Sequence, residues 1–258
     1  MNKMMNRLLR LQALNRNAPR EYRIEAREDS NEVAVYLYDI IGYDWWTDGG
    51  VTAKQFARDL APLNGKTIHL HINSPGGDVF EGRAMVAALK KHEGRIIVHI
   101  DGIAASAASF IAMHGDEIEI TQGAFVMIHN GWTFALGNRH DLRETADLLE
   151  KVDGSIVDDY MGKVNAERSQ VEQWMDDETY FTAAEAVEHG FANRIAGGSE
   201  SGTAKARTWN LSAYDRPPAE LQPEAVPEVV GSQEESDQDL AHAHRFRALA
   251  VHEKKKSA

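Results

Sequence analysis

The pattern of hydrophobic and polar positions changes repeatedly between strand-like and helix-like periods in the middle of the chain. Val33–Tyr38 is rich in β-branched and aromatic residues, and Thr67–Ile72 alternates aliphatic residues with histidines. Three further short apolar runs follow. We predict strands at Val33–Tyr38, Thr67–Ile72, Ile96–Ile100, Glu117–Ile120 and Ala124–Ile128.

Helical periodicity fills the intervals between these runs. Thr52 can cap a helix that continues to Leu60, and Gly190 can end the last one. The predicted helices are Thr52–Leu60, Asp78–His92, Ala105–Met113, Arg139–Asn165 and Thr182–His189. Because strands and helices alternate, the sequence predicts an α/β fold with parallel strand pairing.

The two ends of the chain differ from this folded body, which we place at residues 31–197. Residues 1–30 are expected to form a flexible arm, in which four leucines either line a short amphipathic helix or belong to a poorly ordered leader. Residues 198–258 hold four of the seven prolines and few aliphatic residues, so we expect a low-complexity, largely disordered tail. Ala241–Val251 is a candidate short helix within it.

Composition and charge exclude several classes of function. The chain has 258 residues, 43% of them hydrophobic, which is a globular proportion. Without cysteine it can form no disulfide, zinc-thiolate site or thiol nucleophile. A net charge of −12 argues against a nucleic-acid partner. No apolar run approaches the roughly 20 residues of a membrane span, and charged residues interrupt the N-terminal leucines, so we expect a soluble protein of a reducing compartment.

A serine stands where a predicted strand turns into a predicted helix, within Asp101–Ser109. At such a turn the Ser106 hydroxyl lies near the positive end of the helix dipole, and the following backbone N–H has no intrahelical partner. This arrangement suits a nucleophile whose neighbouring amide binds an oxyanion, although the sequence is not G-x-S-x-G. The alternative is that Ser106 only caps the helix.

A second strand-to-helix turn has the sequence Asn73-Ser74-Pro75-Gly76-Gly77-Asp78. Its two glycines allow backbone N–H groups to point outward, where they can stabilise a carbonyl oxygen that gains charge. A phosphate could be bound in the same way, but no lysine follows to make a P-loop. The remaining interpretation is a tight turn without a ligand.

A histidine and three acids complete the candidate chemistry. His129 ends an apolar strand, and an imidazole can take the proton of a serine at neutral pH. Asp176, Asp177 and Glu178 precede the last helix and could orient that imidazole. Taken alone, His129 could be structural, and the acids could be a solvated turn with helix-capping charge.

Taken in chain order, these motifs resemble the Clp protease proteolytic subunit family. The resemblance rests on Asn-Ser-Pro-Gly-Gly, Gly-x-Ala-Ala-Ser, Met-Ile-His and Thr-Ala-x-Glu-Ala-x-Glu-x-Gly, and covers about residues 33–197. Three segments are more similar to the phage and prophage branch, the Clp-like head maturation proteases, than to the housekeeping enzyme: Asp101–Met113, Tyr43–Val51 and Ile128–Asn130. The family resemblance implies a crotonase-like spiral of ββα units assembled into rings.

The resemblance also implies a role for each matching residue. Ser106 corresponds to the nucleophile, His129 to the general base, and Gly77 and Ala107 to the two oxyanion-hole amides. Glu178 stands where the housekeeping enzymes have aspartate, with Asp177 as the next candidate and Asp176 as the least favoured. Thr133–Leu136 corresponds to a handle region at the contact between two rings, with a strand beside which substrate lies; the other interpretation is a hairpin loop packed on its own domain.

The function implied is a serine-type endopeptidase that is Clp-like or ATP-independent and needs no metal or organic cofactor. Its substrates would be capsid, scaffold or portal precursors, cleaved by a homo-oligomeric ring in the host cytoplasm or inside an assembling procapsid. Two alternatives remain open. One is a crotonase-like acyl-CoA enzyme, which shares the two-amide oxyanion hole, and the other is a catalytically idle capsid assembly or scaffold protein.

Overall fold

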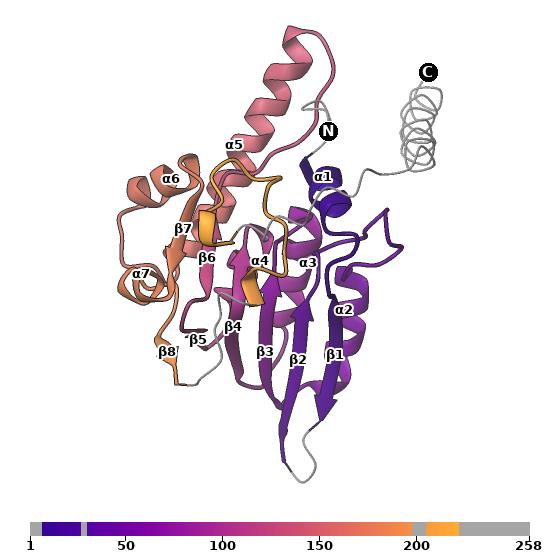
Figure 1. Ribbon diagram of the computed structural model, residues 1–258, viewed down its shortest axis with the longest axis vertical. Coiled ribbons are helices and arrows are strands. Elements are labelled where there is room, and N and C mark those ends of the chain that lie inside the picture. Colours follow the sequence, from indigo (N-terminus) through magenta and orange to yellow (C-terminus); the bar gives the residue numbers. More distant parts are fainter. Residues whose placement is uncertain (1–6, 27–29, 198–204, 222–258) are drawn as a thin grey trace. The chain divides into compact units, whose positions relative to one another are not determined.

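The computed structural model describes residues 7–26, 30–197 and 205–221 (Figure 1). Its strands are β1 (Glu21–Ala26), β2 (Glu32–Tyr38), β3 (Thr67–Ser74), β4 (Ile96–Ala105), β5 (Glu117–Thr121), β6 (Phe125–Ile128), β7 (Thr179–Thr182) and β8 (Arg194–Ala196). Its helices are α1 (Arg7–Leu14), α2 (Ala53–Leu60), α3 (Val79–Leu89), α4 (Ala107–Ala112), α5 (Arg139–Met161), α6 (Arg168–Asp176) and α7 (Ala183–Glu188), with short 3-10 turns at Ala61–Leu63 and Ala219–Leu221.

One mixed sheet organises these elements. Strands β2, β3, β4, β5 and β8 are parallel neighbours in that order, and β1 adds an antiparallel edge. β6 pairs in parallel with the C-terminal end of β4 and antiparallel with β7. A mixed α/β arrangement of this kind agrees with the predicted Clp-like fold.

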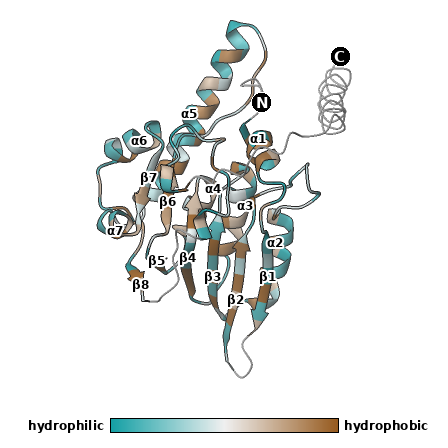
Figure 2. Ribbon diagram, in the orientation of Figure 1, coloured by the Kyte–Doolittle hydropathy of each residue, from teal (hydrophilic) through white to brown (hydrophobic). Residues whose placement is uncertain are grey.

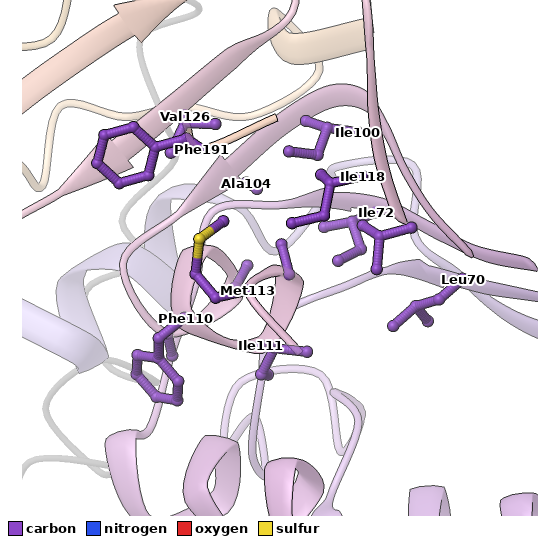
Figure 3. Close-up of a cluster of buried hydrophobic side chains, with 14 of the residues drawn as sticks. Leu70, Ile72, Ile100, Ala104, Phe110, Ile111, Met113, Ile118, Val126 and Phe191 are labelled. Atoms are coloured by element: carbon purple, nitrogen blue, oxygen red, sulfur yellow. The ribbon is translucent and has the colours of Figure 1, made fainter. Parts of the chain in front are cut away.

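The C-terminal end of β4 and its neighbour β6 are buried on both faces. Successive side chains of a strand point to opposite sides, and each side of these two strands packs against a different hydrophobic cluster. Ala104 and Val126 face the main core, where α3 and α4 also pack. Ile103 and Met127, next to them in sequence, face a second cluster. Figure 3 shows part of the main core, including Phe110 and Met113 of the α4 region beneath the strands. In Figure 2 hydrophobic positions are frequent in the central strands, whereas the projecting part of α5 is largely hydrophilic.

All ten predicted elements are present, with shifts of a few residues at their ends. Thr52 caps α2 by accepting from the backbone N–H of Gln55, as the sequence predicted. β4 continues five residues beyond the predicted end at Ile100, because Ile103–Ala105 pair in parallel with Phe125–Met127 of β6. Within the described residues, the strands and α-helices that were not predicted are β1, α6, β7 and β8.

The N-terminal residues differ from the flexible arm that was expected. The leucine-rich helix forms as α1, which buries Leu11 and Gln12, and β1 joins the sheet. Gln12 donates to the backbone oxygen of Tyr43, and Trp46 donates to that of Leu9. These contacts attach α1 to the folded body.

The expected disordered tail also needs correction for residues 205–221, which we call the C-terminal strap. Trp209 is fully buried, and its indole N–H donates to the backbone oxygen of Asn73, 3.1 Å away. Leu211 and Tyr214 pack with the second cluster on the sheet. The strap meets the N-terminal region where Asn15 and Asn210 exchange two hydrogen bonds. Residues 222–258, including the candidate helix at Ala241–Val251, lie outside the described residues.

Replacing the strap's buried tryptophan is expected to destabilise the whole fold. Trp209→Ala should lower the free energy of unfolding by about 3–5 kcal/mol, because it removes a large buried side chain and leaves a cavity. Chemical denaturation checks this, with Trp45→Ala as the control. Trp45 is 52% exposed, so its loss should cost about 1 kcal/mol or less. Equal, small effects of both changes would mean that the strap does not belong to the cooperative unit.

Candidate active site

The three motifs singled out in the sequence meet at one edge of the sheet. Each follows a strand: the Asn73–Asp78 turn follows β3, Ser106 follows β4 and His129 follows β6. These strands are parallel neighbours, with Ser74 paired to Ala104 and Ala105 paired to Met127. Carboxyl ends of adjacent parallel strands lie together, so residues far apart in sequence converge there.

Ser106 occupies a strained backbone conformation. Its φ of +53° and ψ of −120° are rare for a residue with a side chain, and they mark a sharp turn from β4 into α4. The surroundings hold this turn on both sides: the Ser106 N–H donates to the oxygen of Met127, and the Ser106 oxygen accepts from the hydroxyl of Ser109. Ser109 also shares a hydrogen bond with the buried hydroxyl of Tyr160. Such a strained, supported turn is the geometry of a nucleophile elbow.

Ser106 and His129 are in direct contact. The Ser106 Oγ lies 2.7 Å from His129 Nε2, so the hydroxyl donates to the ring when Nδ1 carries the proton. Only 7% of His129 is exposed. Burial, and to a smaller extent the nearby positive charge of Arg7, lower the pKa of His129 to about 3, while Asp215 acts in the opposite direction. The imidazole is therefore neutral at pH 7 and can accept the serine proton.

The glycine turn lies directly beside this pair. Gly76 has a φ of +90°, and a Cβ placed on it would be 2.8 Å from the Cβ of Ser106 and 3.2 Å from the nitrogen of Ala107. A Cβ on Gly77, whose φ is +155°, would lie 2.0 Å from the oxygen of Ile41. Only glycine fits these positions. Within the described part of the chain, neither the Gly77 nor the Ala107 amide donates to a backbone carbonyl, so both are available to an oxyanion.

The structure does not bring Glu178 to His129 as the sequence led us to expect. Its carboxylate instead accepts from the backbone N–H groups of Asp215 and Arg216, at 2.8 and 2.6 Å, and pairs with Arg7 at 3.5 Å. The strap supplies these amides, and it was expected to be disordered.

The two other acids are also engaged elsewhere. Asp177 is half-buried and binds the side chains of Gln173 and Arg216. Asp176 accepts from the side chain of Asn130 at 2.7 Å. Among the described residues, therefore, Ser106 is the hydrogen-bond partner of the His129 ring, and none of the three candidate acids is.

A cleft of about 200 Å³ opens next to Ser106 and His129. Its apolar wall comes from Val79 on one side and Leu149 and Val152 of α5 on the other, with Leu8 of α1 and Trp132 at its margin. A larger hollow of about 430 Å³ between α2 and α3 has no paired nucleophile and base among its lining residues. The cleft at Ser106 is thus the place where a chain could be held against a reactive group.

The segment Thr133–Leu136 does not form the strand that the resemblance implied. It runs without regular secondary structure toward α5, with Phe134 51% and Leu136 82% exposed. A strand needs a partner for its backbone groups, and none of the strands in the described residues pairs with this segment. Figure 1 shows α5 extending beyond the sheet.

Sequence reasoning missed the residues of α1 and of the strap that lie around the base. The Tyr214 ring lies edge-on to that of His129, with centroids 5.3 Å apart, and Arg7 bridges Glu178 and Asp215. The apolar and aromatic residues of Trp209–Tyr214 were the available signal, since they interrupt an otherwise polar tail. In the described residues no group of three or more histidines or acids is arranged to hold a metal ion, and no helix there has the length and apolar character to cross a membrane.

Comparisons with known proteins show which family the chain resembles. A family model described as Clp protease matches residues 51–199, more than half of the chain. The ATP-dependent Clp protease proteolytic subunit 2 of Parasynechococcus marenigrum is 26% identical over 132 residues, covering 50% of this chain and 67% of the relative. The proteolytic subunit of Deinococcus radiodurans is 25% identical over 130 residues, covering 50% and 64%. Subunit 3 of Rhodococcus jostii is 27% identical over 133 residues, covering 50% and 65%. The chain thus matches about two thirds of the length of these relatives.

The buried neutral histidine should make the fold sensitive to acid. An unfolded His129 has an ordinary pKa near 6.5, whereas its folded pKa is lowered to about 3. Between these values the unfolded state binds more protons, so stability falls as the pH drops. Going from pH 7 to pH 5, this residue alone should cost about 2 kcal/mol.

Denaturation of wild type and His129→Asn at both pH values isolates that contribution from those of other titrating groups. The variant should lose about 2 kcal/mol less than wild type over the same interval. Equal losses in the two proteins would show that the ring is not buried in its neutral form.

Proposed function

The chain belongs to the Clp protease family, and from that membership we propose that it is a serine endopeptidase with Ser106 as nucleophile and His129 as general base. The observation that carries the proposal is the 2.7 Å contact between Ser106 Oγ and His129 Nε2 beside two free backbone amides. Nucleophile, base and oxyanion donors are the three parts that acyl transfer from a peptide requires.

The reaction follows from these positions. His129 Nε2 takes the proton as Ser106 Oγ attacks the peptide carbonyl, and the carbonyl oxygen becomes an oxyanion that the Gly77 and Ala107 N–H groups stabilise. His129 then gives the proton to the leaving amine, which leaves an acyl-enzyme. The same imidazole then takes a proton from water as the water oxygen attacks the ester carbonyl. When the bond to Ser106 Oγ breaks, the imidazole gives that proton to Oγ, and the acid product leaves. Every step uses groups of the chain and water, so the proposal needs no cofactor.

The proposed substrates are capsid, scaffold or portal precursors of a phage or prophage, cleaved without an ATPase during head maturation. What supports this finer assignment is the resemblance of Tyr43–Val51, Asp101–Met113 and Ile128–Asn130 to the head maturation branch. We further propose that the enzyme works as a homo-oligomeric ring in the host cytoplasm or the procapsid. Exposed apolar side chains around α5 support such an assembly, because Phe134, Leu136, Leu142 and Leu148 would be covered in it.

A fluorophosphonate probe tests the class of enzyme directly. The probe should attach to Ser106 in the wild-type protein, as found by peptide mapping, because His129 activates that hydroxyl. Ser106→Ala should abolish labelling and reduce cleavage of casein, or of a capsid, scaffold or portal precursor, by about 10⁴-fold or more. Ser169→Ala is the matched control, since Ser169 is exposed on α6 and has no part in the Ser106 turn.

The outcomes separate the alternatives. Folded wild-type protein that stays unlabelled, or Ser106→Ala protein that cleaves as fast as wild type, would rule out the serine mechanism. The first result would leave a crotonase-like enzyme or an idle scaffold protein as the interpretation. Labelling together with turnover of casein but not of capsid precursors would support the peptidase and reject the head maturation role.

A further inference from the structure

The strap places one aromatic residue against both parts of the proposed catalytic machinery. Tyr214 is buried, its ring lies edge-on to the His129 ring at an interplanar angle of 88°, and its hydroxyl donates to the backbone oxygen of Pro75. Pro75 directly precedes the Gly76–Gly77 turn. One side chain therefore contacts the base and the loop that carries an oxyanion donor.

The strap is held in place from both of its sides. On one side Trp209 donates to the oxygen of Asn73, two residues before Pro75. On the other, the Glu178 carboxylate accepts from the amides of the two residues that follow Tyr214, Asp215 and Arg216. Tyr214 lies between these anchors, which hold its backbone beside His129, while its hydroxyl is tied to Pro75.

The site needs such a contact, because His129 has no carboxylate to orient it among the described residues. An imidazole that is hydrogen-bonded only through Nε2 can still rotate about its side-chain bonds, and a small misplacement of a catalytic group lowers the rate steeply. The usual remedy is an acid at Nδ1. Here the acid at the corresponding sequence position, Glu178, binds the strap instead.

We propose that Tyr214 is a positioning residue that holds the His129 imidazole against Ser106 and ties the Pro75–Gly77 turn to it, with Glu178 acting through the strap. This inference rests on the proposed serine peptidase function. It extends the active site to a segment outside the region matched by the family model, which ends at residue 199. It also assigns Glu178 the role of anchoring the strap, through the hydrogen bonds that it accepts from Asp215 and Arg216.

Two substitutions separate the roles of the ring and the hydroxyl. Tyr214→Phe keeps the ring against His129 and removes the hydroxyl, with its hydrogen bond to Pro75 and its interaction with Ser106, so fluorophosphonate labelling of Ser106 should slow by about 10-fold or less. Tyr214→Leu fills the apolar space but removes the ring, so labelling should slow by about 100-fold. Tyr180→Phe is the matched control, because the Tyr180 hydroxyl is buried and has no hydrogen-bond partner among the described residues. It should label at the wild-type rate within about 2-fold.

The pH dependence of labelling gives a readout that a purely structural role would not change. His129 must be neutral to accept the proton, so the rate falls below its pKa. Removing the Tyr214 ring admits water to the imidazole and should raise the pKa of His129 toward its ordinary value. The acid limb of the pH–rate profile should therefore move to higher pH by about one unit or more. The charges of Arg7 and Asp215 act on His129, and those of Glu178 and Arg7 act on Tyr214. These groups remain in every variant, and Tyr180, which interacts with Tyr214, is changed only in its own control. The limb should not move in Tyr214→Phe or Tyr180→Phe.

Thermal unfolding of each full-length variant is measured alongside, so that labelling rates refer to folded protein. A slow Tyr214→Leu protein with a shifted acid limb, partly rescued by phenylalanine, supports the inference. If wild type is labelled and Tyr214→Leu is labelled equally fast, the inference is overturned and the proposed function is not. The same holds if the labelling rate falls equally in Tyr214→Leu and Tyr180→Phe. Folded wild type that does not label overturns the proposed function and this inference together.

Discussion

Parallel pairing of β3, β4 and β6 is the constraint on which the candidate site depends. The ladder sets the carboxyl ends of these strands side by side, so the three turns that follow them share one small space. A register shift of one residue in β4 or β6 would reverse the faces of their side chains and separate Ser106 from His129. Burial of alternate residues in two different clusters, Ala104 in one and Ile103 in the other, opposes any such shift. Core packing and site geometry therefore have the same origin.

The second feature of the site is that α1 and the strap, which lie on either side of the family-matched region, close around it. Arg7 of α1 lies between Glu178 and Asp215, and Asn15 and Asn210 join the two terminal segments to each other. His129 is consequently buried, which keeps it neutral, while its hydrogen bond to Ser106 satisfies Nε2. A neutral buried base costs less desolvation than a charged one, and it is the protonation state that proton transfer from serine needs.

Glu178 illustrates how a sequence position and a structural role can separate. It occupies the motif position at which the resemblance implies a triad acid, yet backbone amides of the strap take both of the hydrogen bonds to its Oε1. A carboxylate satisfied by backbone amides and an arginine is stable without an imidazole partner. The family match identifies the common scaffold within residues 51–199, and the segments on either side of it alter the surroundings of the base.

The sequence by itself determined the alternating strands and helices, the strand-to-helix turns at Gly76–Gly77 and Ser106, and His129 at the end of its strand. These are local: periodicity, small residues and caps act over a few neighbours. Short β1, β7 and β8 were missed, because their pairing comes from distant strands and not from their own pattern. The place of the strap was likewise decided by tertiary structure. A segment rich in proline and polar residues cannot bury itself, but Trp209 and Tyr214 find an apolar face that β4 and β6 leave open, and only the folded sheet creates that face.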